Sequence, residues 1–258
     1  MHIDLTGKRA VVTGSSRGIG RAVAGSLAAA GADVVLVGRT RTSLEHAAQD
    51  IGTAATQVVA DLATAEGCAR LVEAVPACDI LVNNVAMFPN GPFADTPDSQ
   101  WDAVWQLNVM SGVRLARAYL PGQIRTRWGR IVFVSSESAY SLQPGLIPYG
   151  VSKLALLALS RGLAKAAASS GVTVNTVVPG PTMTDALRQA LPLDSPDDPD
   201  ADEKAAAFVR ANRPTTLLGR AATPDEVAHL VTYVCSAQAS ATTGAALRVD
   251  GGVVDSVL

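Results

Sequence analysis

The fold of this chain is decided near its N-terminus, by the stretch KRAVVTGSSRGIGRAVAGSLAAAG at residues 8–31. Residues 8–13 are a short apolar run typical of a strand, and residues 21–31 are rich in alanine and leucine, as in a helix. The three glycines between them let backbone approach a phosphate, and a helix N-terminus supplies free N–H groups. A tight structural turn is the alternative, but a strand before and a helix after favour a dinucleotide site.

The same alternation of short apolar runs and helical stretches continues along the chain. Several runs are apolar at successive positions, as in strands that helices cover on both faces. The strand candidates are 8–13, 33–37, 56–60, 79–82, 130–135, 172–178 and 245–249, and helices are expected near 18–30, 41–51, 64–74, 99–125, 148–170 and 224–236. We therefore predict an α/β fold with a doubly wound, Rossmann-type sheet of seven parallel strands, in a single domain spanning 1–258.

Composition excludes several classes of protein. The 48% of hydrophobic residues argues against a disordered chain, and a net charge of −2 gives no reason to expect nucleic acid or an anionic membrane as partner. No apolar run is long enough to span a membrane, and the N-terminus does not resemble a signal peptide. The three scattered cysteines predict neither a disulfide framework nor a zinc site. We expect a cytoplasmic protein without a metal site.

A second motif is YGVSK at residues 149–153. Tyrosine and lysine are both scarce in this chain, so the pair is rarely expected by chance. Positions four apart lie on one face of a helix, so the Tyr149 phenol and the Lys153 ammonium can reach one site. A neighbouring cation lowers the pKa of a phenol from its usual value of about 10. A merely structural Tyr–Lys pair is the alternative.

The glycine turn TGSSRGIG (13–20) and YGVSK together resemble the short-chain dehydrogenase/reductase family, in the branch with chains of about this length. Matching landmarks run from residue 8 to residue 252. The resemblance implies a tyrosine acid–base, a lysine that lowers its pKa, a serine that donates to the substrate carbonyl oxygen, and an asparagine that supports a water relay. Ser135 and Ser138 compete for the serine role. The implied catalytic residues are Asn108, Ser136, Tyr149 and Lys153.

The resemblance also implies a set of nucleotide-binding residues. Residues 83–86 (NNVA) resemble the family's NNAG, but Ala86 adds a methyl group where backbone approaches the cofactor. Residues 179–184 (PGPTMT) resemble the family's segment beside the nicotinamide. The cofactor-binding candidates are Gly14, Ser16, Arg17, Gly18, Ile19, Gly20, Arg39, Asp61, Leu62, Asn84, Ala86, Tyr149, Lys153, Pro179, Gly180, Thr182 and Thr184.

The choice of nicotinamide cofactor depends on the end of the second strand. An NAD site usually has an acidic residue there, and the stretch VVLVGRTRT (34–42) has none. Arg39 in this stretch and Arg17 in the glycine turn are placed to reach a 2′-phosphate, which guanidinium groups suit. We therefore expect NADP(H) rather than NAD(H).

One segment breaks the alternation. Residues 191–203 are acidic and contain Pro192, Pro196 and Pro199, so a regular element is not expected there. A solvated surface segment and a mobile lid over the substrate both remain open, and we place the candidate lid at 183–213.

The sequence thus predicts an oxidoreductase that transfers a hydride between NADP(H) and a carbonyl or secondary alcohol. An NAD-dependent dehydrogenase of a sugar or other alcohol, a cofactor-dependent epimerase and a non-catalytic dinucleotide-binding regulator stay open. β-Ketoacyl carrier-protein reductases are a near resemblance, but the acids at 194–203 would repel an acidic carrier protein if they lie at the mouth of the site. A neutral ketone, sugar or polyketide-like substrate is equally admissible. Residues 151–168 are apolar almost all round, which predicts that one face packs on the sheet and another on a partner subunit. The family resemblance implies a homotetramer, or a homodimer, as that assembly.

Overall fold

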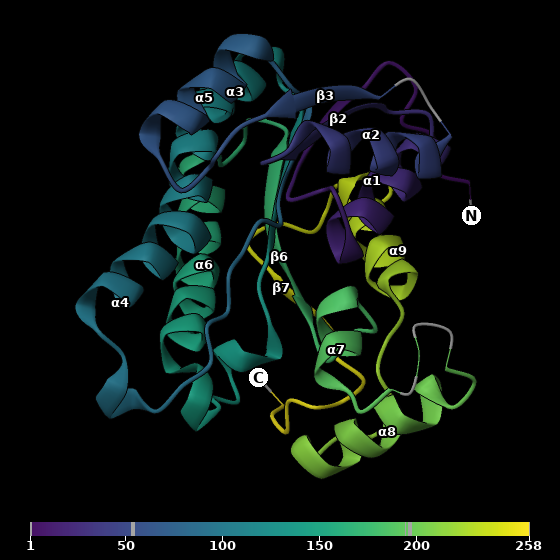
Figure 1. Cartoon of the computed structure of the whole chain (residues 1–258). Coiled ribbons are helices and arrows are strands. Elements are labelled where there is room, and N and C mark those ends of the chain that lie inside the picture. Colours follow the sequence, from purple (N-terminus) through teal and green to yellow (C-terminus); the bar gives the residue numbers. More distant parts are fainter. Residues whose placement is uncertain (1, 53–54, 194, 196–197, 258) are drawn as a thin grey trace.

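A computed structural model describes residues 2–52, 55–193, 195 and 198–257. Its centre is a seven-stranded sheet in the order β3-β2-β1-β4-β5-β6-β7, and all neighbours pair in parallel (Figure 1). The predicted doubly wound, single-domain α/β fold is confirmed. The strands are β1 (Arg9–Thr13), β2 (Asp33–Gly38), β3 (Thr56–Val59), β4 (Ile80–Asn83), β5 (Gly129–Val134), β6 (Val172–Pro179) and β7 (Ala246–Val249).

Helices cover both faces of this sheet, which explains why the central strands are apolar at successive positions. β5 and β6 are buried along their whole length. Two separate clusters of buried side chains form the core, one on each face. One face carries α1 (Gly18–Ala29), α2 (Arg41–Ile51) and α9 (Pro224–Cys235), and the other carries α3 (Ala65–Ala74), α5 (Ser111–Thr126) and α6 (Ile147–Ala166).

The strand order reverses direction between β1 and β4. From β1 the chain moves outward to β3 and then returns to pair β4 with the other side of β1. In open parallel sheets, ligands bind at the carboxyl ends of the strands beside such a reversal. The glycine turn, Asn84 and Gly180 directly follow β1, β4 and β6, and Ser136 lies two positions after the end of β5. The fold therefore brings them to one edge of the sheet.

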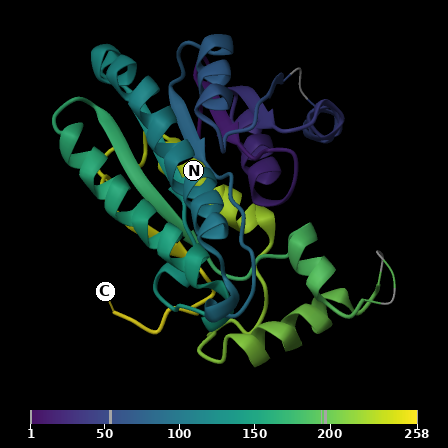
Figure 2. The ribbon, with the colours of Figure 1, turned by 60° about the vertical axis from the view of Figure 1, so that its left-hand side comes forward.

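Three helical features differ from the sequence-based expectation. The helix expected at 99–125 is divided into α4 (Asp98–Trp105), a π-helical turn (Gln106–Met110) and α5. The structure also contains α7 (Asp185–Ala190) and α8 (Ala201–Asn212), neither of which was predicted (Figures 1 and 2).

The start of α8 shows why the acidic segment was misread. Asp202 and Glu203 lie in the first helical turn, where negative charge is favourable near the N–H groups. Asp198 is buried and forms an ion pair with Lys204, with 2.8 Å between carboxylate and ammonium. The prediction of an irregular segment at 191–203 is therefore wrong from residue 201 onward, and residues 194, 196 and 197 lie outside the described part of the chain.

The start of α9 carries a capping box. The Thr223 hydroxyl accepts from the Glu226 N–H at 3.2 Å, and the Glu226 carboxylate accepts from the Thr223 N–H at 2.8 Å. We expect Thr223→Ala to lower the free energy of unfolding by about 1 kcal/mol, since it leaves a helix donor without its partner. Thr223→Ser keeps the acceptor and serves as the control in denaturant unfolding. Equal stability of both variants would contradict this role.

Within the described ranges, no helix is both long and apolar enough to cross a membrane.

Candidate active site

The glycine turn after β1 folds back tightly on itself. Gly14 and Gly18 adopt positive φ angles of 63° and 54°. A side chain at Gly20 would place its Cβ 2.3 Å from the Gly14 carbonyl oxygen, so the turn closes only because this position is glycine. At the start of α1, the described residues provide neither a capping side chain nor an acid in the first turn. Its N–H groups thus remain available to an anion such as a diphosphate.

Asn84 shapes this turn from the neighbouring strand end. Its side-chain amide donates to the carbonyl oxygens of Thr13 and Gly14, at 2.9 and 3.2 Å. Its backbone N–H donates to the Thr13 hydroxyl at 2.9 Å. Asn84 was predicted to contact the cofactor, and in this structure its side chain supports the glycine turn.

The two predicted arginines lie on adjoining loops. The Ser15 hydroxyl accepts from the Val37 N–H at 2.8 Å, which ties the glycine turn to the end of β2. Ser16 lies against Gly38, with its Cβ 3.7 Å from an ideal Cβ at that glycine. Arg17 and Arg39 follow these contact points directly, and both are exposed. Neither of them forms an ion pair with any described residue.

Tyr149 and Lys153 lie in the first two turns of α6, as the sequence predicted. The Lys153 ammonium is 5.5 Å from the centre of the Tyr149 ring and donates to the Val134 carbonyl at 2.8 Å. Burial raises the pKa of Tyr149, and the neighbouring Ser136 side chain opposes that shift. Burial also lowers the pKa of Lys153 to about 7. Both groups are therefore held in a site where their charged forms are disfavoured.

Ser136 is the serine that meets Tyr149. Its hydroxyl accepts from the Ser138 N–H at 3.1 Å and donates to a Glu137 carboxylate oxygen at 2.5 Å. Ser135 points elsewhere, since its hydroxyl donates to the Lys153 carbonyl at 2.8 Å. The turn that carries Ser136 packs closely on α6: a Cβ at Gly150 would lie 2.7 Å from the Ser138 carbonyl oxygen. Glycine at this position therefore allows the serine turn to approach Tyr149.

Asn108 lies in the π-helical turn and is buried. Its amide donates to the Met87 carbonyl at 2.9 Å and to the Ser152 hydroxyl at 3.0 Å, and its carbonyl oxygen accepts from the Met87 N–H at 2.9 Å. These bonds tie the loop after β4 to α6. In this structure the Asn108 side chain thus positions the site, while the predicted water relay stays a prediction.

The remaining cofactor candidates occupy the rim of the same edge. Thr184 lies over the glycine turn, with its methyl group 3.3 Å from an ideal Cβ at Gly18, and its hydroxyl caps α7. The Thr182 hydroxyl donates to the Gly180 carbonyl at 2.9 Å. Leu62 is buried in the core, so only its backbone could meet an adenine. Four further candidates lie at this edge. Ile19 is at the start of α1 and Pro179 at the end of β6, whereas Asp61 and Ala86 lie in loops.

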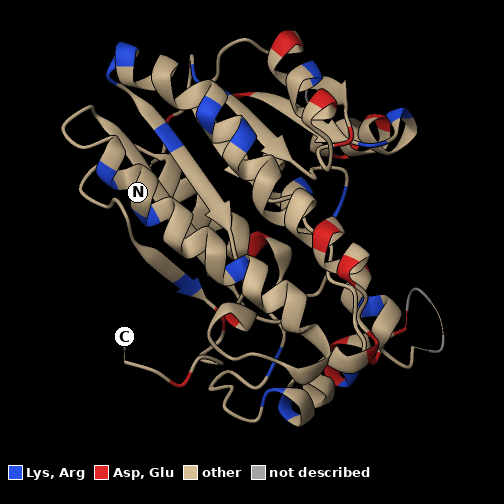
Figure 3. Ribbon diagram, turned by 90° about the vertical axis from the view of Figure 1, so that its left-hand side faces the viewer, with Lys and Arg blue, Asp and Glu red and all other residues tan. Residues whose placement is uncertain are grey.

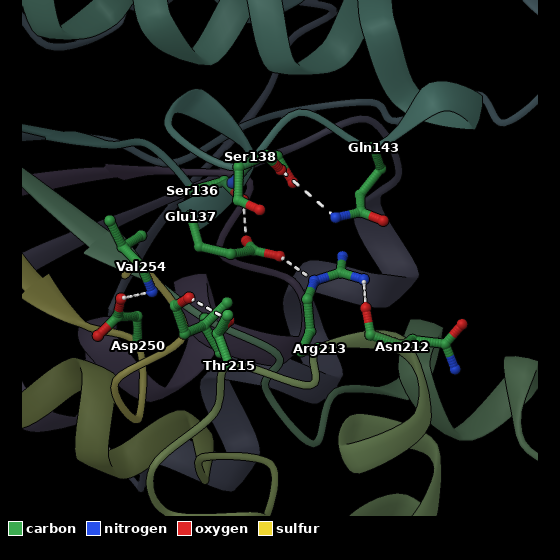
Figure 4. Close-up of polar contacts among 12 residues, drawn as sticks. Ser136, Glu137, Ser138, Gln143, Asn212, Arg213, Thr215, Asp250 and Val254 are labelled. Carbon is green, nitrogen blue, oxygen red and sulfur yellow. Dashed lines mark hydrogen bonds and ion pairs between the residues drawn. The ribbon is translucent and has the colours of Figure 1, made fainter. Parts of the chain in front are cut away.

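Two residues of this site were not predicted from the sequence. Glu137 and Arg213 form an ion pair, with 2.9 Å between the guanidinium Nε and the carboxylate (Figure 4). Their side chains are only 5% and 15% exposed. Glu137 directly follows Ser136, but Arg213 is 76 positions away at the end of α8. Only the fold brings them together, so no sequence motif could have identified the pair.

No group of three metal-ligating side chains occurs among the described residues.

A family model described as enoyl-(acyl carrier protein) reductase matches residues 14–254. The protein named uncharacterized oxidoreductase YvaG of Bacillus subtilis is 41% identical over 263 residues, covering 100% of both chains.

Two solved structures are similar to this chain in both sequence and fold. One, a short chain dehydrogenase/reductase family protein, is 35% identical with a TM-score of 0.86, covering 97% of this chain and 98% of the other. The L-sorbose reductase of Gluconobacter frateurii, solved with NADPH and L-sorbose, is 33% identical with a TM-score of 0.91, covering 100% of both chains.

Proposed function

This chain belongs to the short-chain dehydrogenase/reductase family, and we propose that it transfers a hydride between NADP(H) and a carbonyl or secondary alcohol substrate. The observation that carries this proposal is the placement of Ser136, Tyr149 and Lys153 at the sheet edge that also holds the glycine turn. A non-catalytic regulator would need only the glycine turn.

The residues present fit a dinucleotide. The closed turn Gly14–Gly20 presents backbone rather than side chains at the uncapped first turn of α1, and this arrangement suits a diphosphate. Thr184 borders the turn on one side, and the β2 end borders it on the other. When bound, the nicotinamide supplies or accepts the hydride.

Each catalytic residue has a distinct task in carbonyl reduction. The raised pKa of Tyr149 keeps its hydroxyl protonated near neutral pH, as a proton donor to the carbonyl oxygen requires. The Ser136 hydroxyl is the second donor to that oxygen. Lys153, when protonated, favours release of the Tyr149 proton. We propose that Asn108 supports this set by holding the loop after β4 against α6.

The preference for NADP(H) has support from both the chain and its relatives. Arg17 and Arg39 are exposed on adjoining loops and lack carboxylate partners in the described structure, so they are available to a 2′-phosphate. The solved L-sorbose reductase contains NADPH. We also propose that α7 and α8, within the 183–213 segment, cover the substrate, because Arg213 joins this segment to the serine turn.

The direct test is oxidation of NADPH by the purified chain with a panel of ketones, aldehydes and ketoses, followed by absorbance. Turnover with at least one carbonyl is the expected result. A chain that binds NADPH but turns over no carbonyl, and no alcohol with NADP⁺, would favour a non-catalytic regulator.

We further propose that the chain forms a homotetramer or homodimer through α6. Its outward face presents Val151, Leu154, Ala158 and Gly162, which follow helical spacing, and Leu154 is 49% exposed. Figure 3 shows this side of the molecule, where the helix ribbons are tan over most of their length and carry separate blue and red turns. Such a face is typical of a covered surface. Light scattering is expected to show an oligomer that Leu154→Glu dissociates; a wild-type monomer at micromolar concentration would argue against this assembly.

A further inference from the structure

The buried carboxylate of Glu137 lies between the catalytic serine and the α8 segment. One oxygen, Oε1, accepts from the Arg213 guanidinium at 2.9 Å. The other, Oε2, accepts from the Ser136 hydroxyl at 2.5 Å (Figure 4). Ser136 is its only donor among the described residues. Both carboxylate oxygens of Glu137 thus have a hydrogen-bond donor only while the Ser136 hydroxyl points toward Oε2.

Carbonyl reduction changes this arrangement. The Ser136 hydroxyl has a single proton, and in this structure that proton is donated to Glu137. To bind the substrate carbonyl, Ser136 must turn the same proton toward the carbonyl oxygen. Oε2 of Glu137 then loses its donor while it remains buried, and an unsatisfied buried acceptor is costly. A substrate that brings its own donor would remove this cost.

Resting on the function proposed above, we propose that Glu137 determines specificity by accepting a hydrogen bond from a hydroxyl on the carbon next to the substrate carbonyl. Such a hydroxyl can lie about 2.7 Å from the carbonyl oxygen, which is also the ordinary length of an O–H···O bond. Four oxygens then form a ring, namely those of the Ser136 hydroxyl, the substrate carbonyl, the substrate hydroxyl and Oε2 of Glu137. Ser136 donates its proton to the carbonyl oxygen, and the substrate hydroxyl donates its proton to Oε2. The preferred substrates are α-hydroxy ketones, the class to which ketoses belong.

Arg213 keeps Oε2 turned toward Ser136. Because Nε holds Oε1, the carboxylate cannot rotate away from the serine without breaking the ion pair. A second guanidinium nitrogen of Arg213 donates to the Asn212 carbonyl at 2.9 Å, which fixes the guanidinium at the end of α8. Arg213 is thus a positioning residue for the acceptor, and the substrate hydroxyl meets Glu137 itself.

The first experiment uses the wild-type chain with NADPH and ketones that differ only by a hydroxyl in place of a methyl group. Hydroxyacetone is paired with butanone, and α-hydroxyacetophenone with propiophenone. We expect kcat/KM to be at least about tenfold higher for the hydroxylated member of each pair, as for a hydrogen bond to a charged group. Equal values, or a preference for the methyl compounds, would overturn the proposal.

The second experiment measures the same ratio in Glu137→Gln. The neutral amide oxygen accepts a weaker hydrogen bond, so the preference for hydroxylated ketones should fall by about tenfold. Glu73→Gln, the same change at an exposed position of α3, should keep the wild-type ratio. Thermal unfolding shows whether Glu137→Gln is folded; if it is not, the wild-type pairs decide the question.

The possible failures are distinguishable. If the wild-type chain reduces none of the carbonyl compounds with NADPH and oxidises no alcohol with NADP⁺, the proposed function is wrong. If it reduces ketones and Glu137→Gln keeps the full preference for hydroxylated ones, the function stands and Glu137 is not the specificity residue.

Discussion

Tyr149→Phe is expected to lower kcat for carbonyl reduction by about 10²–10⁴-fold, the usual contribution of a positioned acid–base group. The substitution removes only the phenolic oxygen, so the ring should remain packed beside Phe88, at 5.9 Å between ring centres. Lys153 is held by the Val134 carbonyl rather than by Tyr149, so its position should also persist. Affinity for NADPH, measured by fluorescence, should therefore change little.

The control for this variant is Tyr119→Phe, which also removes a buried phenolic oxygen. The Tyr119 hydroxyl, on α5, donates to the carbonyl of Val75 at the end of α3, at 2.9 Å. Tyr119→Phe should lower the free energy of unfolding by about 1 kcal/mol and leave kcat unchanged. If Tyr149→Phe retained more than a tenth of the wild-type kcat, another group would have to supply the proton.

The double variant Arg17→Ala/Arg39→Ala is expected to lower the ratio of kcat/KM for NADPH to that for NADH by about 100-fold, with about tenfold from each arginine. Each guanidinium can donate charge-assisted hydrogen bonds to a 2′-phosphate, and NADH has no such group. Because both side chains are exposed, high salt should weaken the effect. Steady-state kinetics with both cofactors measure the ratio.

Arg21→Ala provides the matched control. Arg21 lies one helical turn after Arg17, but its guanidinium forms an ion pair with Asp50 at 2.5 Å. Removing it should change stability slightly and leave the cofactor ratio as in the wild type. A wild-type chain that uses NADH more efficiently than NADPH would reverse the cofactor assignment altogether.

The sequence predicted the sheet and most helices because their signals are local. Strand β5 reads GRIVFV and is buried on both faces, and such apolar runs identify strands without knowledge of their neighbours. The helix α8 was missed because the acids and prolines before it suggested a loop, whereas the buried Asp198 and its ion pair with Lys204 stabilise its start. The π-helical turn at Asn108 was missed because it depends on contacts with Met87 and Ser152.

For the site, the sequence alone determined the glycine turn and the Tyr149–Lys153 pair. Both are short motifs whose geometry follows from a turn and from the four-residue repeat of a helix face. The family resemblance already favoured Ser136 over Ser135, and the packing adds that the Ser135 hydroxyl points to the Lys153 carbonyl instead. The contact of Arg213 with Glu137, 76 positions away, is visible only in the folded chain. The physical reason is that local spacing fixes local geometry, whereas the direction of a side chain and its distant partners depend on how the elements pack.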